Sequence, residues 1–357
     1  MPEATTHQPL ARAVRAAFGE GTGIVASRAL AGDASNRRYV RLTLAGPGAP
    51  PTAVAMLLGR ARFGAGGDEL GGAAAPTELP FVNVGRWLAA RGFPVPALYH
   101  DAAATDDLLL LEDIGDTTLW AAASTTPTAT ERLFGDAVDL LVALQAAGAR
   151  HPDPACVAFT RRFDTGLARA ELEHFLDHGI ETRHGRRLPA AERTTLLTGL
   201  TPLVDVFATA SPVLVHRDFM AWNLHVQAGR LRLIDFQDAF LGPEAYDLAA
   251  LLTDRRTPEL IGPAMAETLI GRFRHGRAAA GLPVAGNLEA DYRLCVLHRA
   301  LKVIGRFHFL ECVQGKPGYL AYLPAVYAVA RAAFDALPAL AAVRERIGTH
   351  VPELATA

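Results

Sequence analysis

Apolar residues recur at two different spacings along the chain, and the change between them separates a front part from a back part. In the first 112 residues, short alternating or continuous apolar runs predict strands. These runs are GIVASRAL (23–30), RRYVRLTLA (37–45), TAVAMLL (52–58), PALYHD (96–101) and DLLLLEDI (107–114), whereas residues 8–18 and 80–92 have helical spacing. The pattern therefore predicts a strand-rich front part with two helices.

Helical spacing dominates after Gly115, beginning with ERLFGDAVDLLVALQAAG (131–148). In this back part only VLVHRD (213–218), NLHVQAG (223–229) and RLRLIDF (230–236) look extended. The change occurs at LLLLEDIGD, where an apolar strand runs into a short acidic link that contains a glycine. We therefore expect an N-terminal domain over 1–112, a link over 113–116 and a helical domain over 117–357.

Composition narrows the class of protein. Half of the 357 residues are hydrophobic, a fifth are charged and the formal net charge is -2, so no overall positive field favours nucleic acid. The three cysteines are far apart and odd in number, which favours neither a disulfide framework nor a zinc cluster. We see neither a leader pattern nor an apolar run of about 18 residues, so we expect a cytoplasmic protein without a membrane partner. The sequence leaves the oligomeric state open.

One short segment, VLVHRDFMAWNLHV (213–226), places polar residues between two apolar runs. Such residues are costly to bury unless they are paired or functional. The segment has the spacing His-Arg-Asp-x-x-x-x-Asn, with Asp218 followed by Asn223, and Asp235 ends an apolar run twelve residues later. The residues between Asn223 and Asp235 predict a hairpin that returns Asp235 toward Asn223.

The residue types in this arrangement suit phosphoryl transfer. Magnesium prefers oxygen ligands, which Asn223 and Asp235 supply. Asp218 stands apart from them and is able to orient an acceptor hydroxyl and accept its proton. A hydrogen-bonded turn would explain an isolated His-x-Asp, but the joint spacing of all three residues favours a catalytic loop.

The segments HRDFMAWNL, LIDFQDAFLGPEAYDLAALL and LLLLEDIGD resemble the aminoglycoside phosphotransferase family, whose members are related to protein kinases. Within the family, GDASNRRY, LLLLEDIGDTTL, DFQDA, LKVIGRF and GKPGYLAYLP look most like the anomeric kinases of N-acetylmuramate and N-acetylglucosamine in cell-wall recycling. The resemblance covers the whole chain. It implies an α+β, bilobal protein-kinase-like fold with a small antiparallel-sheet N-lobe, a larger mainly helical C-lobe, and ATP and Mg²⁺ as cofactors.

By this resemblance, Asp218 is the catalytic base, Asn223 and Asp235 hold Mg²⁺, and the backbone of Glu112, Asp113 and Ile114 pairs with adenine. Asp247 would support the catalytic loop through His216 or Arg217, although an acid at a helix start is an equally good interpretation. Asp238 would be either a support for a metal ligand or a turn acid.

One departure concerns the phosphates of ATP. Protein kinases carry a lysine on the third strand, but here Met56 or Leu57 stands there, and the chain has lysine only at Lys302 and Lys316. Arg37 and Arg38 are candidate replacements because a guanidinium binds phosphate with two hydrogen bonds, with Ser35 and nearby amides covering the phosphates. The alternative is that both arginines are solvated residues of a strand. Glu78 would pair with such an arginine or act as a helix-start acid.

The acceptor is the least determined feature. Only twelve residues separate Asp235 from Asp247, too few for the activation segment of a protein kinase, which favours a small acceptor. Candidates for acceptor contacts are Asp116, Trp222, Arg299, Lys302 and Arg306. The last three share one helix stripe that suits an anionic sugar or, alternatively, forms a solvated basic face. An N-acetylated hexosamine is our first hypothesis, another small alcohol or an aminoglycoside the second, and a nucleotide-binding pseudokinase the third.

Overall fold

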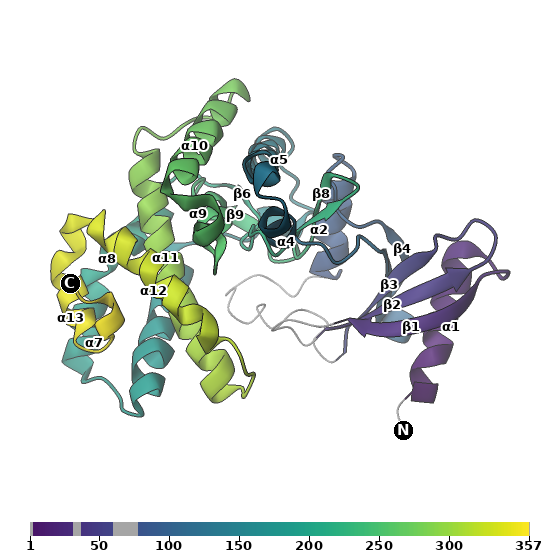
Figure 1. Ribbon diagram of the computed structural model, residues 1–357, viewed down its shortest axis with the longest axis horizontal. Helices are drawn as coiled ribbons and strands as arrows, with labels where there is room; N and C mark the ends of the chain where they lie inside the picture. The colour runs from purple at the N-terminus through teal and green to yellow at the C-terminus, as the bar shows by residue number, and fades with distance from the viewer. Residues whose placement is uncertain (1–2, 31–36, 60–77, 357) are drawn as a thin grey trace. The chain divides into compact units, whose positions relative to one another are not determined.

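The computed structural model describes residues 3–30, 37–59 and 78–356, which are coloured in Figure 1. The chain divides into two compact units. Unit 1 consists of Met1–Asp116 together with His225–Gln237, and unit 2 consists of Thr117–Leu224 together with Asp238–Ala357. The segment His225–Gln237 therefore packs with the N-terminal unit. The single division expected from the sequence, at residues 113–116, does not include this segment in the N-terminal domain. Ser35, the Gly-rich stretch 60–76 and most of GDASNRRY lie outside the described residues.

Unit 1 is built on an antiparallel sheet of five strands in the order β1-β2-β3-β5-β4. The strands are β1 (Gly23–Leu30), β2 (Arg38–Ala45), β3 (Thr52–Leu57), β4 (Leu98–Ala102) and β5 (Leu108–Glu112). Each of the five strands predicted from the front part is confirmed to within about two residues at its ends. The continuous apolar run in β5 has a simple cause, because Leu108, Leu109, Leu110 and Leu111 are all buried.

The helix α1 (Glu3–Phe18) covers one face of this sheet, as Figure 1 shows. Leu10, Ala13 and Val14 recur at helical spacing and pack against Leu42 and Leu44 of β2, together with alanines and leucines of β3 and β5. This apolar stripe is the reason that the N-terminal segment is helical and docked. It gives unit 1 a core on that side of the sheet.

A second group in unit 1 combines α2 (Pro80–Ala89) with the hairpin β7 (Leu224–Gln227) and β8 (Arg230–Leu233). Ala228 and Gly229 form the hairpin turn with φ of 49° and 76°, the conformation that a tight two-residue turn requires. Phe236 follows the hairpin and stacks on Phe81 of α2, with ring centroids 4.9 Å apart. The predicted hairpin is therefore confirmed, and α2 holds the chain just after Asp235.

Unit 2 is mainly helical, and its central helix is α11 (Leu288–His308), which packs against α6, α8, α9 and α12. The other helices are α4 (Leu119–Thr125), α5 (Thr130–Arg150), α6 (Thr165–His174), α7 (Ala190–Gly199), α8 (Thr201–Thr209), α9 (Tyr246–Thr253), α10 (Thr257–Ala279), α12 (Leu323–Asp335) and α13 (Ala341–Gly348). Within the described ranges, no single helix has the length and apolar composition to cross a membrane. One pair of segments, Leu320–Asp335 and Pro338–Gly348, passes that test together but is bent by 105°.

Unit 2 also contains a small sheet, of which the apolar pattern predicts one strand. β6 (Val213–Val215), in a segment expected to be extended, pairs antiparallel with β9 (Phe240–Gly242), which was not expected. The three residues of β9 are too few to display a period of two, and no extended run of greater length surrounds them. This pair fixes the start of the loop that contains Asp218 beside the segment that leads to α9.

Candidate active site

The loop His216–Asn223 begins where β6 ends, and a single buried carboxylate holds its first turn. Asp247, in the first turn of α9, accepts hydrogen bonds from the backbone amides of His216 at 2.6 Å and Arg217 at 3.0 Å. Arg217 has a φ of 80°, a strained conformation for a non-glycine residue that persists only where its surroundings enforce it. Asp247 thus contacts the loop through the backbone amides of His216 and Arg217.

Asp218 follows this turn, and its side chain is 34% exposed. Burial alone would raise the pKa of Asp218, but the positive charges of Lys302, Arg299 and Arg217 hold that pKa below its usual range. Arg299 is the nearest in geometry, with Nη1 at 3.9 Å from Oδ1 of Asp218, and it also donates to the Arg217 carbonyl at 2.9 Å. The Asp218 carboxylate is therefore ionised and partly open to solvent, as a proton acceptor requires.

A buried acid, Glu171 of α6, organises these positive charges. Its carboxylate lies 2.6 Å from the ammonium of Lys302 and 3.4 Å from the guanidinium of Arg217. His298 of α11 is fully buried beside it and contacts the Ala168 carbonyl at 3.0 Å. Glu171 was not among the sequence candidates, because nothing in its own segment distinguishes it from an ordinary polar helix residue.

The proposed metal ligands belong to different units, Asn223 to unit 2 and Asp235 to unit 1. Asn223 donates its amide Nδ2 to the Asp218 carbonyl at 2.9 Å, which orients its amide oxygen away from that carbonyl. Asp235 has a φ of 64°, and its Oδ1 accepts a hydrogen bond from Gln237 at 2.9 Å. Both side chains are thereby held by local contacts, and both supply the oxygen atoms that magnesium prefers.

Asp238, two residues after the apolar run, lies in unit 2 and within electrostatic reach of Arg161 and Arg217. This position is compatible with both interpretations of Asp238, as a support for a metal ligand or as an acid that stabilises the turn.

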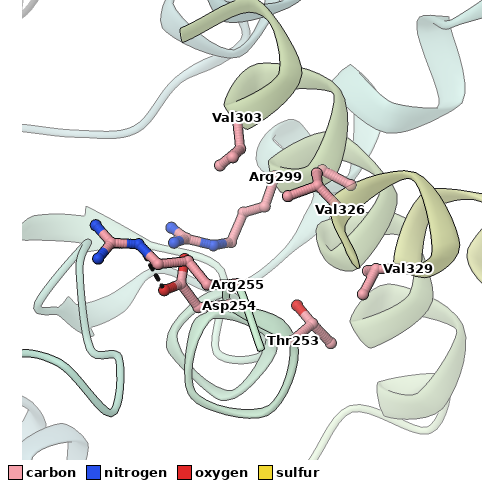
Figure 2. Close-up of a pocket in the computed structure, with 8 residues that line it drawn as sticks. Thr253, Asp254, Arg255, Arg299, Val303, Val326 and Val329 are labelled. Atoms are coloured by element: carbon pink, nitrogen blue, oxygen red, sulfur yellow. Dashed lines mark ion pairs between the residues drawn. The ribbon is translucent and has the colours of Figure 1, made fainter. Parts of the chain in front are cut away.

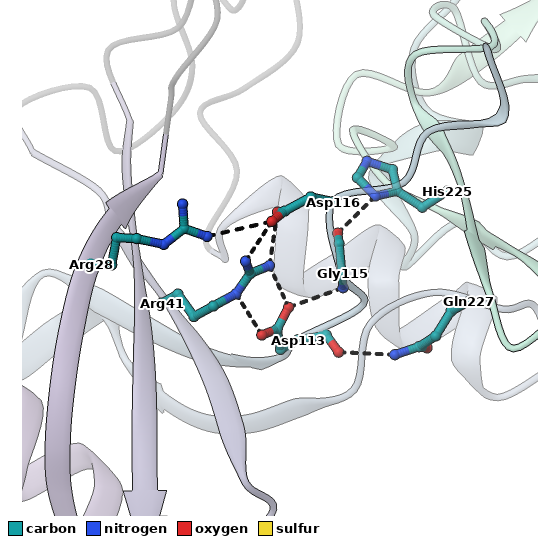
Figure 3. Close-up of polar contacts among 7 residues, drawn as sticks. All are labelled: Arg28, Arg41, Asp113, Gly115, Asp116, His225 and Gln227. Atoms are coloured by element: carbon teal, nitrogen blue, oxygen red, sulfur yellow. Dashed lines mark hydrogen bonds and ion pairs between the residues drawn. The ribbon is translucent and has the colours of Figure 1, made fainter. Parts of the chain in front are cut away.

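Ion pairs and hydrogen bonds within unit 1 hold the segment Glu112–Asp116 in place, and Figure 3 shows those of Asp113, Gly115 and Asp116. Arg41 of β2 donates to both carboxylate oxygens of Asp113, at 2.7 and 2.8 Å, and to both of Asp116, at 2.6 and 2.8 Å. Burial would raise the pKa of Asp113, but the hydrogen bonds from Arg41 and Gly115 hold it below its usual range. Asp116 also meets Arg28 at 3.4 Å, so its carboxylate already has two arginine partners.

Side chains of the β7–β8 hairpin hold the same segment from another side. His225 contacts the Gly115 carbonyl at 3.0 Å, and Gln227 donates to the Asp113 carbonyl at 3.1 Å. Arg232 binds Glu112 at 2.8 and 2.5 Å. Burial would raise the pKa of Glu112, but the hydrogen bonds from Arg232 and from the Ala97 amide hold that pKa below its usual value. One backbone carbonyl in the stretch proposed to face adenine, that of Asp113, is therefore already a hydrogen-bond acceptor.

The position of the missing lysine is apolar in the structure as well. Met56 of β3 is fully buried and pairs in register with Tyr39 of β2. Arg37, next to this pair, is 8% exposed and has a side-chain hydrogen bond to Tyr39, whereas Arg38 is exposed. Glu78 pairs with Arg86 of α2 at 2.5 Å, so the arginine it meets is not one of the two phosphate candidates.

The remaining acceptor candidates have specific partners in unit 2. Trp222 stacks on Trp120 with ring centroids 4.9 Å apart. The guanidinium of Arg255 lies over the Trp222 ring, 5.2 Å from its centroid. Arg299 is buried and Lys302 is bound to Glu171, so two of the three residues on the helix stripe do not form a solvated basic face. Arg306 lies over the Phe309 ring at 5.5 Å.

Sequence reasoning missed Trp120, Glu171, Gln237, Arg41 and Arg255 because their roles come from tertiary contacts. Gln237 could have been found from the sequence, since it stands in the DFQDA motif next to the candidate Asp238.

Comparisons with known proteins agree with this geometry. A protein from Pseudomonas putida named N-acetylmuramate/N-acetylglucosamine kinase is 32% identical over 75% of this chain and 76% of its own length. A protein of the same name from Caulobacter vibrioides is 30% identical over 95% of this chain and 96% of its own.

Solved structures share the fold at low sequence identity. An amicoumacin kinase in complex with AMP-PNP, Ca²⁺ and Ami has a TM-score of 0.62 at 14% identity and covers 95% of both chains. An ADP-bound aminoglycoside phosphotransferase has a TM-score of 0.55 at 14% identity and covers 92% of this chain and 97% of its own. The predicted kinase-like fold is therefore confirmed. The model of the phosphotransferase enzyme family (APH) matches residues 27–283, and with these relatives it shows that the chain belongs to that family.

Proposed function

We propose that this chain is an ATP-dependent kinase of N-acetylmuramate and N-acetylglucosamine that phosphorylates the anomeric hydroxyl. The observation that carries the proposal is the ionised Asp218 in a loop braced by Asp247, in a chain that is similar over 95% of its length to a relative of that name. The acceptor class comes from the relatives' names. The anomeric position comes from the segments that resemble the anomeric sugar kinases.

In this proposal Asp218 orients the anomeric hydroxyl and accepts its proton as the oxygen attacks the terminal phosphorus of ATP, and the bond from that phosphorus to the bridging oxygen breaks to release ADP. Lys302, Arg299 and Arg217 keep Asp218 ionised, so the base is ready at neutral pH. Asp247 fixes the loop from which Asp218 projects. Little covalent chemistry is required of the protein, since catalysis in this class is mostly positioning and charge neutralisation.

Asn223 and Asp235 are the residues we assign to magnesium. Their donor atoms are an amide oxygen and a carboxylate, the donor chemistry that magnesium prefers, and each side chain is oriented by a hydrogen bond of its own. When bound, the ion neutralises charge on the phosphates of the nucleotide. Asp238, which lies within electrostatic reach of Arg161 and Arg217, would support a metal ligand.

We assign ATP to the backbone of Glu112, Asp113 and Ile114 for the base, and to Ser35, Arg37 and Arg38 for the phosphates. Structural neighbours with ADP or AMP-PNP support a nucleotide. Of the two arginines, Arg37 is the better substitute for the absent lysine, because it is buried next to Tyr39, the residue in register with Met56. Domain roles follow, with unit 1 binding nucleotide and unit 2 binding acceptor.

The test is ADP release from MgATP with a panel of acceptors: N-acetylglucosamine, N-acetylmuramate, glucose, choline, homoserine and two aminoglycosides. Turnover on the two N-acetyl sugars supports the proposal. Turnover on choline, homoserine or an aminoglycoside alone would move the acceptor to another small alcohol. Bound MgATP without turnover on any acceptor would favour a pseudokinase, which the missing lysine motivates.

A further inference from the structure

Arg217, the residue before the proposed base, has the strained φ of 80° and is held at three separate points. Its backbone amide donates to Asp247 at 3.0 Å, and its carbonyl accepts from Arg299 at 2.9 Å. Its guanidinium is buried and donates to Glu171 at 3.4 Å. The first two contacts fix the backbone directly. The third acts through the side chain and comes from α6, where Glu171 stands 46 residues before Arg217.

The two partners of the Arg217 backbone come from packed helices of unit 2. Asp247 is fully buried in the first turn of α9. Arg299 extends from α11 into a small pocket that the segment Thr253–Arg255 after α9 also lines (Figure 2). Since α9 and α11 pack against each other, they hold the backbone of Arg217 from one rigid part of the unit.

The charge of Glu171 is directed at Lys302 and Arg217. Its Oε1 lies 2.6 Å from the ammonium of Lys302 and also accepts from Arg217. Its Oε2 faces Nδ1 of His298 at 3.8 Å, and neither of these two buried atoms has a hydrogen-bond partner among the described residues.

The protonation of His298 explains these two unpaired atoms. Its Nε2 donates to the Ala168 carbonyl at 3.0 Å, because a carbonyl only accepts, so the proton of the neutral ring is on Nε2. Burial lowers the pKa of His298, which keeps the ring neutral and leaves Nδ1 without a proton. His298 therefore does not neutralise Glu171, and the carboxylate acts on the two cations.

We propose that Glu171 is a positioning residue for the reaction. By holding the side chain of Arg217 it maintains the left-handed backbone of that residue, and it thereby directs the carboxylate of Asp218, the next residue, toward the acceptor hydroxyl. A displacement of about 1 Å at a reacting group is enough to cost about 100-fold in rate. The inference rests on the proposed function, in which Asp218 is the base, and adds to it a residue that acts only through Arg217.

The kinetic test uses Glu171→Gln, which keeps the shape of the side chain and removes its charge. Glu173→Gln is the matched control, since Glu173 lies on the same helix and pairs with Arg169 at the surface at 3.1 Å. We expect Glu171→Gln to lower kcat with N-acetylglucosamine by about 10- to 100-fold, the value of a hydrogen bond to a charged group. The KM values for ATP and for the sugar should change by less than about threefold, and Glu173→Gln should change none of the three. A rise in KM without a fall in kcat would overturn the inference.

Amide hydrogen exchange tests the same contact without any turnover. In Glu171→Gln the amides of His216 and Arg217 should exchange about tenfold faster, while those of β3 exchange as in the wild type. Unchanged exchange at His216 and Arg217, or an equal increase in β3, would overturn the inference, because the second result reports only a loss of global stability.

Glu171→Asp covers the case in which Glu171→Gln does not fold. It keeps the buried charge but is one methylene shorter, so the longer contact, to Arg217, is lost first. We expect kcat to fall by about three- to tenfold, with faster exchange at His216 and Arg217 alone. Unchanged kcat and unchanged exchange would overturn the inference. Wild-type protein that phosphorylates no acceptor would overturn the proposed function, and the exchange of these amides would still decide whether Glu171 holds Arg217.

Discussion

The ammonium of Lys302 lies 2.6 Å from the carboxylate of Glu171, and this buried pair is part of the charge that surrounds Asp218. Glu171 neutralises one of the three cations near the base and holds Arg217 at 3.4 Å as well. The remaining positive charge keeps Asp218 ionised although burial opposes it. The protonation state of Asp218, the proposed base, thus depends on Arg217 of the loop itself and on charges from α6 and α11, elements remote in sequence from the loop.

Replacing Lys302 with methionine should therefore raise the pKa of Asp218. Since the base works only when it is ionised, the acidic limb of the pH profile of kcat/KM should move to higher pH, with activity near its normal value well above that limb. Lys316→Met, at the other lysine of the chain, is the control and should leave the profile unchanged. A Lys302→Met profile that is lowered equally at every pH would show a purely structural role.

Arg41 should matter for nucleotide binding because it fixes Asp113 and Asp116, which flank Ile114. Arg41→Lys keeps the charge but loses the paired hydrogen bonds to the two carboxylates. We expect the KM for ATP to rise by about tenfold, the value of one charge-assisted hydrogen bond. Arg28→Lys is the control, since Arg28 is 64% exposed and meets Asp116 only at 3.4 Å. A similar KM for ATP in the two variants would contradict this assignment.

Asp247 makes the stability of the fold depend on pH. Burial raises the pKa of Asp247 to about 7, although its bonds from His216 and Arg217 and the charge of Arg299 oppose the rise. A raised carboxyl pKa means that the folded state holds the proton more tightly than the unfolded state. Its contribution to stability is complete below about pH 4 and is lost as the pH rises through about 7.

Asp247→Asn removes this titration. The free energy of unfolding of the wild type minus that of the variant should fall by a few kcal/mol between pH 4 and pH 8. Urea denaturation of both proteins across that pH range measures this difference. The subtraction removes the contribution of the carboxylates that both proteins share. A difference that is constant with pH would contradict the role assigned to burial of Asp247.

Asp235→Ala should abolish the magnesium-dependent part of nucleotide binding. Calorimetric titration of ATP with and without Mg²⁺ measures this part directly. Asp205→Ala removes one negative charge from an exposed position of α8 and is the control. Unchanged magnesium dependence in Asp235→Ala would refute the assignment of Asp235 to the ion.

Local spacing predicted the strands of unit 1 well, because each strand carries an apolar run or alternation of its own and glycines mark several of the turns. Gly92, for example, ends α2 with a φ of 75°, as expected of a glycine stop. The strand β9 could not be predicted in this way, since three residues carry no period. The association of residues 225–237 with unit 1 also lay beyond the pattern, because it depends on tertiary contacts such as Phe236 on Phe81.

The candidate site shows the same division. Asp218, Asn223 and Asp235 stand at fixed spacing in one stretch of sequence, so their selection needed no structure. Glu171 and Arg255 gain their significance only from partners far along the chain, Lys302 for the first and Tyr322 for the second. The interpretation of Arg299 and Lys302 as a basic face failed for that reason, since a helical stripe does not reveal that a buried acid faces it.

The most direct test of the central claim is to identify the product formed from N-acetylglucosamine and MgATP. Phosphorus and proton nuclear magnetic resonance would show which hydroxyl carries the new phosphate, and Asp218→Asn would be measured beside the wild type. We predict coupling of phosphorus to the anomeric proton, with turnover by Asp218→Asn lowered about a hundredfold or more and ATP affinity nearly unchanged. Phosphate on another hydroxyl, or equal turnover by Asp218→Asn, would contradict this account.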